Sequence, residues 1–154
     1  MYQTGTAIEV LGNAFIAAVV AQVLKVFYFT CVQKKFNFKV FTTTGGMPSS
    51  HSATVIALSM TVGYNMGMNS IPFAIALGYA FVVMYDAAGV RRAAGKQAAC
   101  LNRIIMDIYK QELKEAGGKL KELLGHTPMQ VFAGAVFGVV YSYYMHLFFQ
   151  TFVK

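Results

Sequence analysis

Four apolar runs constrain the fold of this chain more than any other feature of its sequence. They cover residues 8–32, 49–67, 71–89 and 128–150, and short polar or basic segments separate them. Each run has about the 17–25 residues that a helix needs to cross a bilayer. Only 12% of the residues are charged, whereas soluble domains carry about 25%. The sequence therefore predicts an all-α integral membrane helical bundle with about four transmembrane helices, in a single domain over residues 1–154.

A longer polar region lies between the third and fourth runs. Within residues 93–123, Leu101, Ile104 and Ile108 recur at helical spacing on the side opposite Arg103. This pattern predicts an amphipathic helix that lies on the membrane surface or packs under the bundle. We interpret its charged residues as a solvated face.

The basic residues predict how the bundle is oriented. They concentrate in segments 33–47 and 90–125, which four spans place on the same side of the membrane. The positive-inside rule then predicts that this side faces the cytoplasm, in an inner or plasma membrane, with both termini outside. The net charge of +7 is explained by this topology, and no nucleic-acid-binding signature accompanies it, so we expect no nucleic-acid partner.

A short polar stretch opens the second apolar run, with the sequence Gly45-Gly46-Met47-Pro48-Ser49-Ser50-His51-Ser52. The first turn of a helix presents unpaired N–H groups and the positive end of the helix dipole, and both attract anions. A histidine at this place can exchange protons near neutral pH. The stretch therefore indicates an anion site at the membrane edge, although Ser49 could serve only as the helix cap.

The predicted topology brings further polar residues to the same face. They come from the starts of the second and fourth runs and from the ends of the first and third: His51, His126, Lys25, Lys39, Asp86, Arg91 and Arg92. Two histidines among several cations disfavour a metal ion but suit phosphate, which arginine can bind through two parallel hydrogen bonds. A neutral histidine can attack phosphorus while a protonated one donates to the leaving oxygen. We expect no metal and no cofactor. Lys25 could instead extend its charge to the nearby interface.

Three segments carry a resemblance to a known family. Met47-Pro48-Ser49-Ser50-His51 resembles the Pro-Ser-Gly-His motif of the type 2 phosphatidic acid phosphatase superfamily, which includes the vanadium haloperoxidases. Residues 126–134 are similar to the superfamily's His-x-x-x-Asp-Val-x-x-Gly segment. With residues 85–98, these segments resemble the divergent branch of the superfamily, small membrane proteins described as acid phosphatase/haloperoxidase-related. The resemblance extends over about residues 20–145.

This resemblance implies a lipid phosphatase that works without a metal. Its substrate would be a membrane lipid phosphate such as phosphatidate, or a polyprenyl diphosphate. His126 would be the nucleophile that forms a phosphohistidine, and His51 would be the general acid. The phosphate-binding residues that the resemblance implies are Ser49, Ser50, Lys25 or Lys39, and Arg91 or Arg92.

The sequence also departs from the superfamily pattern. Gln130 stands where the superfamily has the aspartate that orients the nucleophilic histidine, and an amide carries no charge to stabilise imidazolium. Asp86 could take over this orienting task, or it could pair with Arg91 or Arg92. Two other functions therefore stay open: a non-catalytic phospholipid-headgroup binder or lipid transporter, and a metal-dependent hydrolase that uses both histidines and Asp86.

The fourth run contains a pair of small residues at helical spacing. Gly134 and Gly138 are four residues apart, which favours close packing between transmembrane helices. The partner helix could belong to the same chain or to a second copy, so self-association into a homo-oligomer is one outcome that this pair allows.

Overall fold

The fold is described from a computed structural model of the chain, over residues 6–34, 41, 45–108 and 125–152. Within these ranges the chain forms helices and no strand, which confirms the predicted all-α class. The helices are α1 (Ala7–Gln33), α2 (Ser50–Met66), α3 (Ile71–Ala88), α4 (Val90–Ile108) and α5 (Pro128–Phe152).

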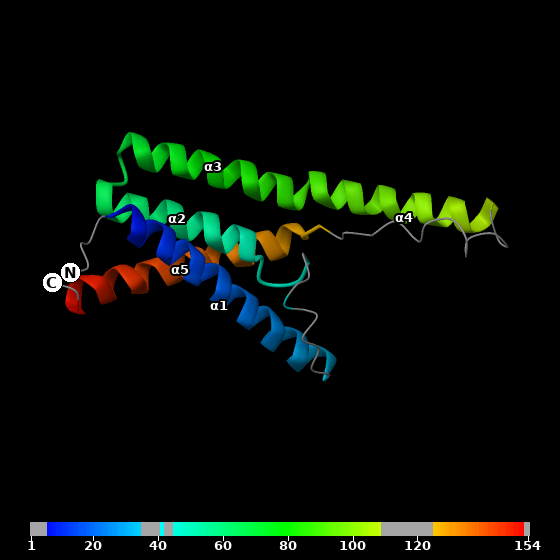
Figure 1. Ribbon diagram of the computed structural model, residues 1–154, viewed down its shortest axis with the longest axis horizontal. Coiled ribbons are helices and arrows are strands. Elements are labelled where there is room, and N and C mark those ends of the chain that lie inside the picture. The colour runs from blue at the N-terminus through cyan, green and yellow to red at the C-terminus, as the bar shows by residue number, and fades with distance from the viewer. Residues whose placement is uncertain (1–5, 35–40, 42–44, 109–124, 153–154) are drawn as a thin grey trace.

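Helix α2 is the centre of the bundle, because α1, α3 and α5 all pack against it (Figure 1). Three described stretches are long and apolar enough to cross a membrane: α1, the continuous stretch Ile71–Ile105, and α5. Helix α2, with 17 residues, is shorter and lies among them. The start of α1 and the end of α5 lie toward one end of the bundle, and α4 extends from the other (Figure 1).

Local side-chain caps explain where the helices begin. The Thr6 hydroxyl accepts a hydrogen bond from the Glu9 N–H at 3.3 Å, and the Ser70 hydroxyl accepts one from the Phe73 N–H at 3.3 Å. Such bonds satisfy N–H groups that a helix start otherwise leaves unpaired. At the other end of α2, Gly67 adopts a φ of 94°, which favours glycine and ends the helix.

One row of residues on α1 faces the bundle along its length. Its members recur every fourth residue, and each is at most 4% exposed: Glu9, Asn13, Ala17, Ala21 and Lys25. Side chains four residues apart lie on the same face of a helix. The two central alanines are fully buried and allow close helix packing, while a charged residue stands near each end of the row. Ionisable residues buried in a membrane helix commonly mark a functional region.

The glycine pair on α5 packs within the chain, against α2. A Cβ on Gly134 would meet the Ser49 carbonyl oxygen, and one on Gly138 would lie 2.8 Å from the Ala53 carbonyl oxygen. The close packing that this pair favours therefore takes place between α5 and α2. A homo-oligomer would have to use another surface.

Helix α4 contains residues 93–108 of the predicted amphipathic segment 93–123. A single residue, Gly89, separates α4 from α3, and α4 continues the direction of α3 past the end of the bundle (Figure 1). The hydrogen-bond ladder crosses the junction, since the Gly89 N–H donates to the Tyr85 carbonyl at 2.8 Å and the Ala93 N–H to the Gly89 carbonyl at 2.9 Å. Residues 109–123 of the predicted segment lie outside the described residues.

Candidate functional site

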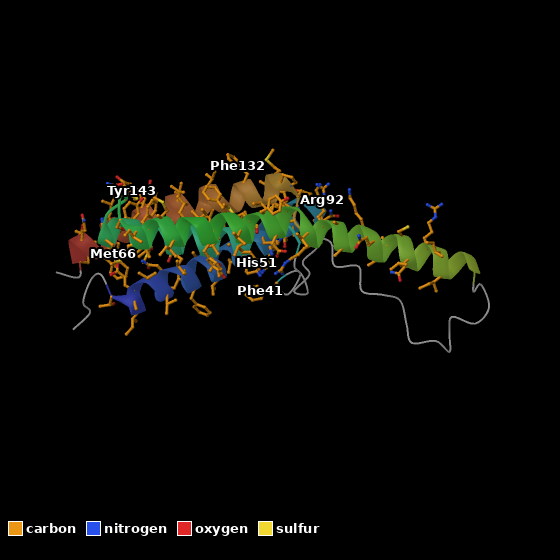
Figure 2. All side chains as sticks on the ribbon, turned by 90° about the horizontal axis from the view of Figure 1, so that it is seen from above. Phe41, His51, Met66, Arg92, Phe132 and Tyr143 are labelled. Atoms are coloured by element: carbon orange, nitrogen blue, oxygen red, sulfur yellow. The ribbon has the colours of Figure 1, made fainter. Side chains whose placement is uncertain are left out.

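The two histidines meet because α2 and α5 begin side by side at one end of the bundle. The ring centroids of His51 and His126 are 5.8 Å apart, and the rings meet edge to face at an interplanar angle of 76°. Figure 2 shows His51 and Arg92 toward the end of the bundle from which α4 extends. The tertiary structure thus assembles a histidine pair from residues far apart in the sequence.

His126 is the buried member of the pair, whereas His51 is exposed. The side chain of His126 is 2% exposed, and its Nε2 has no hydrogen-bond partner among the described residues. Its backbone N–H donates to the Ala87 carbonyl at 3.1 Å, which fixes it to the end of α3. Burial, helped by the charges of Lys25, His51 and Arg91, lowers the pKa of His126 from 6.5 to about 4. The His126 imidazole is therefore neutral at pH 7.

Ser49 is the N-cap of α2. Its hydroxyl oxygen accepts hydrogen bonds from the Ser52 N–H at 3.4 Å and from the Ser52 hydroxyl at 3.1 Å, and its side chain is fully buried. Ser49 therefore caps the helix, which is one of the two roles considered for it from the sequence. Ser50 follows in the first turn and is 7% exposed. The backbone N–H groups of this turn remain the anion-attracting feature of the stretch.

Gln130 forms a capping box with Thr127. Its side-chain oxygen accepts from the Thr127 N–H at 3.0 Å, and its own N–H donates to the Thr127 hydroxyl at 3.3 Å. The carboxamide is therefore bound to the start of α5. The Thr-x-x-Gln spacing in the sequence is a known signature of this motif and could have predicted this arrangement.

Lys25, one of the two lysines considered for the site, lies near the histidines. Lys25 is 1% exposed, and its charge acts on both histidines. Gly46 covers its aliphatic chain: a Cβ there would lie 3.1 Å from the Lys25 Cγ and Cδ, and the φ of 102° also favours glycine. Lys39 lies outside the described residues.

Asp86 and Arg91 form an ion pair beside the histidines. The Arg91 Nε lies 2.6 Å from the Asp86 Oδ2, with the side chains 56% and 37% exposed respectively. This is one of the pairings considered for Asp86, and it lies at the surface. The charges of both residues act on His51, and that of Arg91 acts on His126 as well.

Gly125 and Ala87 complete the site, and neither was predicted to belong to it. A Cβ on Gly125 would meet the backbone of Arg91 and Arg92, so the residue before His126 packs directly on the junction of α3 and α4. The half-buried Arg92 is thereby placed at the edge of the site. Among the described residues, no three His, Cys, Asp or Glu side chains form a group that could hold a metal ion.

Comparison with known proteins shows that the chain is similar to one protein family. The model of a family described as "Divergent PAP2 family" matches residues 7–141. The "Uncharacterized membrane protein YuiD" of Bacillus subtilis (strain 168) is 41% identical over 148 residues, which cover 90% of this chain and 94% of that protein. No solved structure matches the chain.

Proposed function

We propose that this chain hydrolyses the phosphate ester or diphosphate of a membrane lipid at its histidine pair. The premise is its family: the chain belongs to the Divergent PAP2 family. The chain is a membrane protein with helices able to span the bilayer. His126 supports the proposal most directly, because it is a buried neutral imidazole beside His51 whose Nε2 has no hydrogen-bond partner among the described residues.

A neutral imidazole nitrogen with an available lone pair is a nucleophile. In the proposed reaction, His126 Nε2 attacks phosphorus, and the P–N bond forms as the P–O bond to the lipid breaks. His51 donates its proton to the leaving oxygen. Water then gives a proton to His51 and attacks phosphorus, the P–N bond breaks, and inorganic phosphate leaves.

The surrounding charges suit a phosphate group. Lys25 and Arg91 both act electrostatically on His126, and cations aimed at phosphate oxygens stabilise the charge of the transition state. The negative charge of a bound phosphate also favours the protonated form of His51 that the first step requires. The N–H groups at the start of α2 add to this set of anion-binding groups.

The basic segments 33–47 and 90–125 adjoin this end of the bundle in the sequence. By the positive-inside rule, we propose that the site faces the cytoplasm and that both termini lie outside. A substrate held in the bilayer would then present its headgroup at the membrane edge, beside His51.

A specific observation favours the second function, a headgroup binder or lipid transporter without turnover. The Gln130 carboxamide is bound to Thr127 and the Asp86 carboxylate to Arg91. Both groups considered for orienting His126 thus have other partners. In histidine-dependent hydrolases the orienting carboxylate stabilises the imidazolium that forms during the reaction. Loss of this carboxylate therefore lowers turnover.

Phosphate release from phosphatidate and from a polyprenyl diphosphate tests the proposal, with the full chain in mixed micelles and with or without EDTA. We expect release to survive EDTA and to be lost in His126→Ala. His146→Ala is the matched control, because His146 lies within α5, twenty residues after His126, and stacks on Tyr64 with ring centroids 4.6 Å apart. Headgroup binding without release would support the second function, and release that EDTA abolishes would contradict the proposed reaction.

A further inference from the structure

An apolar stripe runs without interruption from α3 into α4. On α3 it contains Ala76, Ala80, Met84 and Ala87, and steps of three or four residues continue it on α4 through Val90, Ala94, Ala98, Leu101 and Ile104. The α3 part faces α2: Ala80 and Ala87 are at most 3% exposed, and the Ala76 carbonyl accepts a bond from the Ser59 hydroxyl at 2.9 Å. The stripe on α4 therefore points to the same side of the bundle.

On α4 this stripe is exposed. Val90 is 58% exposed, Leu101 49% and Ile104 47%. Among the described helices α4 contacts α3 alone, because α2 begins at Ser50 and does not extend beside it. Arg92, Lys96 and Arg103 lie on the opposite face of α4 by helical spacing. Over Val90–Ile108 the sequence carries four basic residues and one acidic residue.

We propose that α4 docks its apolar stripe on an anionic lipid surface by bending toward α2 at Gly89. Glycine is a common point for a helix to bend, and Gly89 joins α4 to a stretch able to span the membrane. Because the stripe faces the α2 side, a bend in that direction lays α4 across the end of the bundle and turns the stripe toward the membrane surface. Leu101 stands about 18 Å along the helix from Gly89, which is more than one helix spacing of about 8–10 Å, so this part of the stripe reaches past α2 to the lipid. The basic residues then lie within about a Debye length of the lipid headgroups, roughly 8–10 Å at physiological salt.

Charge favours a lipid surface over a second copy of the chain as the occupant. Two α4 helices carry the same excess of basic residues and repel one another, whereas anionic headgroups attract them. The junction with α3 also holds α4 next to the membrane, so docking does not require a second molecule to bind. Docking does not depend on whether the site at His51 and His126 hydrolyses phosphate.

Tryptophan fluorescence tests the proposal, since the chain contains no tryptophan. Leu101→Trp reports on the stripe and Lys96→Trp on the opposite face. The full chain is placed in phosphatidylcholine vesicles with brominated acyl chains, with and without phosphatidylglycerol. We expect bromine to quench Leu101→Trp only when phosphatidylglycerol is present, and acrylamide in the water to quench Lys96→Trp in both. When Lys96→Gln is added to Leu101→Trp, the equilibrium constant for docking should fall about fivefold.

The proposal is overturned if acrylamide quenches Leu101→Trp equally in both kinds of vesicle. It is also overturned if protection of Leu101→Trp disappears when the protein is diluted in lipid, because that result identifies a second copy as the occupant. Ile104→Trp provides a second probe of the stripe, and the circular dichroism of each variant shows that it has folded.

Discussion

The backbone N–H of Ser49 donates a hydrogen bond to the carbonyl oxygen of Gln130 at 3.0 Å. This bond joins the cap of α2 to the first turn of α5. Since Ser49 stands two residues before His51, and Gln130 four residues after His126, it sets the position of one histidine against the other. Gly134 permits this approach, because its missing side chain leaves room for the Ser49 carbonyl.

Gly134→Ala is expected to disrupt the site by separating α5 from α2. The added Cβ would meet the Ser49 backbone and lie 3.0 Å from the Ser52 Cβ. Overpacking of this kind costs about 1–3 kcal/mol. Thermal unfolding in detergent micelles measures the loss. Gly78→Ala is the control, because its Cβ would meet nothing within 4 Å. It should leave stability unchanged or raise it, and equal destabilisation by both substitutions would contradict the packing argument.

Gln130→Ala is expected to lower the free energy of unfolding by about 1 kcal/mol, since it removes one half of the capping box. Gln130→Glu should retain the stability, because glutamate can form the same box and its charge suits a helix N-terminus. Chemical unfolding followed by circular dichroism compares the two variants. If Gln130→Ala abolished phosphate release without any loss of stability, the residue would have an orienting role instead.

Asp86→Asn is expected to strengthen binding of an anionic headgroup and to change stability by less than about 1 kcal/mol, because the ion pair with Arg91 is exposed. Removing the carboxylate leaves the cations beside the histidines unbalanced. Equilibrium binding of a short-chain phosphatidate at low and high salt measures the effect, which should shrink as salt screens it. Asp107→Asn makes the same charge change near the end of α4 and should have little effect.

Lys25→Met is expected to weaken phosphate binding by roughly 10- to 100-fold, since charge-assisted hydrogen bonds contribute roughly 1.5–3 kcal/mol. Methionine keeps an unbranched apolar chain to pack against Gly46. The same binding assay measures the loss, and circular dichroism shows that the variant has folded. Lys34→Met serves as the control because Lys34 is exposed. Unchanged binding in Lys25→Met would remove this lysine from the site.

Acid is expected to destabilise the protein through His126. The pKa is about 4 in the folded state against 6.5 ordinarily, so between these values the unfolded chain binds a proton that the folded chain does not. Stability from this residue is therefore present above about pH 6.5 and is lost as the pH falls toward 4, by up to about 3 kcal/mol. Unfolding at pH 7.5 and pH 5 measures it, and His126→Gln should show a smaller loss. An equal loss in both proteins would contradict the shift.

The helices of this chain could be predicted closely from the sequence because their signals are local. The start of α5 at Pro128 matches its prediction, and that of α2 at Ser50 differs by one residue, since apolar runs and capping residues act within a few positions. The continuation of α3 into α4 was not predicted. The sequence predicted that a helix ends at Gly89 and the arginines that follow it. In the structure, backbone hydrogen bonds of the helical type continue across Gly89 from α3 into α4.

The histidines of the site could be named from the sequence, whereas the roles of their neighbours could not. Ser49 could cap a helix or bind phosphate, and Asp86 could pair with Arg91 or orient His126. The structure gives Ser49 the cap and Asp86 the ion pair. Such choices depend on which groups lie within hydrogen-bond distance, and residue types alone do not specify it.

The sequence by itself determined that the chain is a helical membrane protein, and it placed two histidines, each at the start of an apolar helix. Hydrophobic length and capping residues suffice for this, because both act along the chain. Only the tertiary structure decided that Gly134 packs on Ser49, that Ala87 holds His126, and that Lys25 lies beside the pair. These contacts join segments far apart in the sequence, and only the packing of whole helices around α2 brings them together.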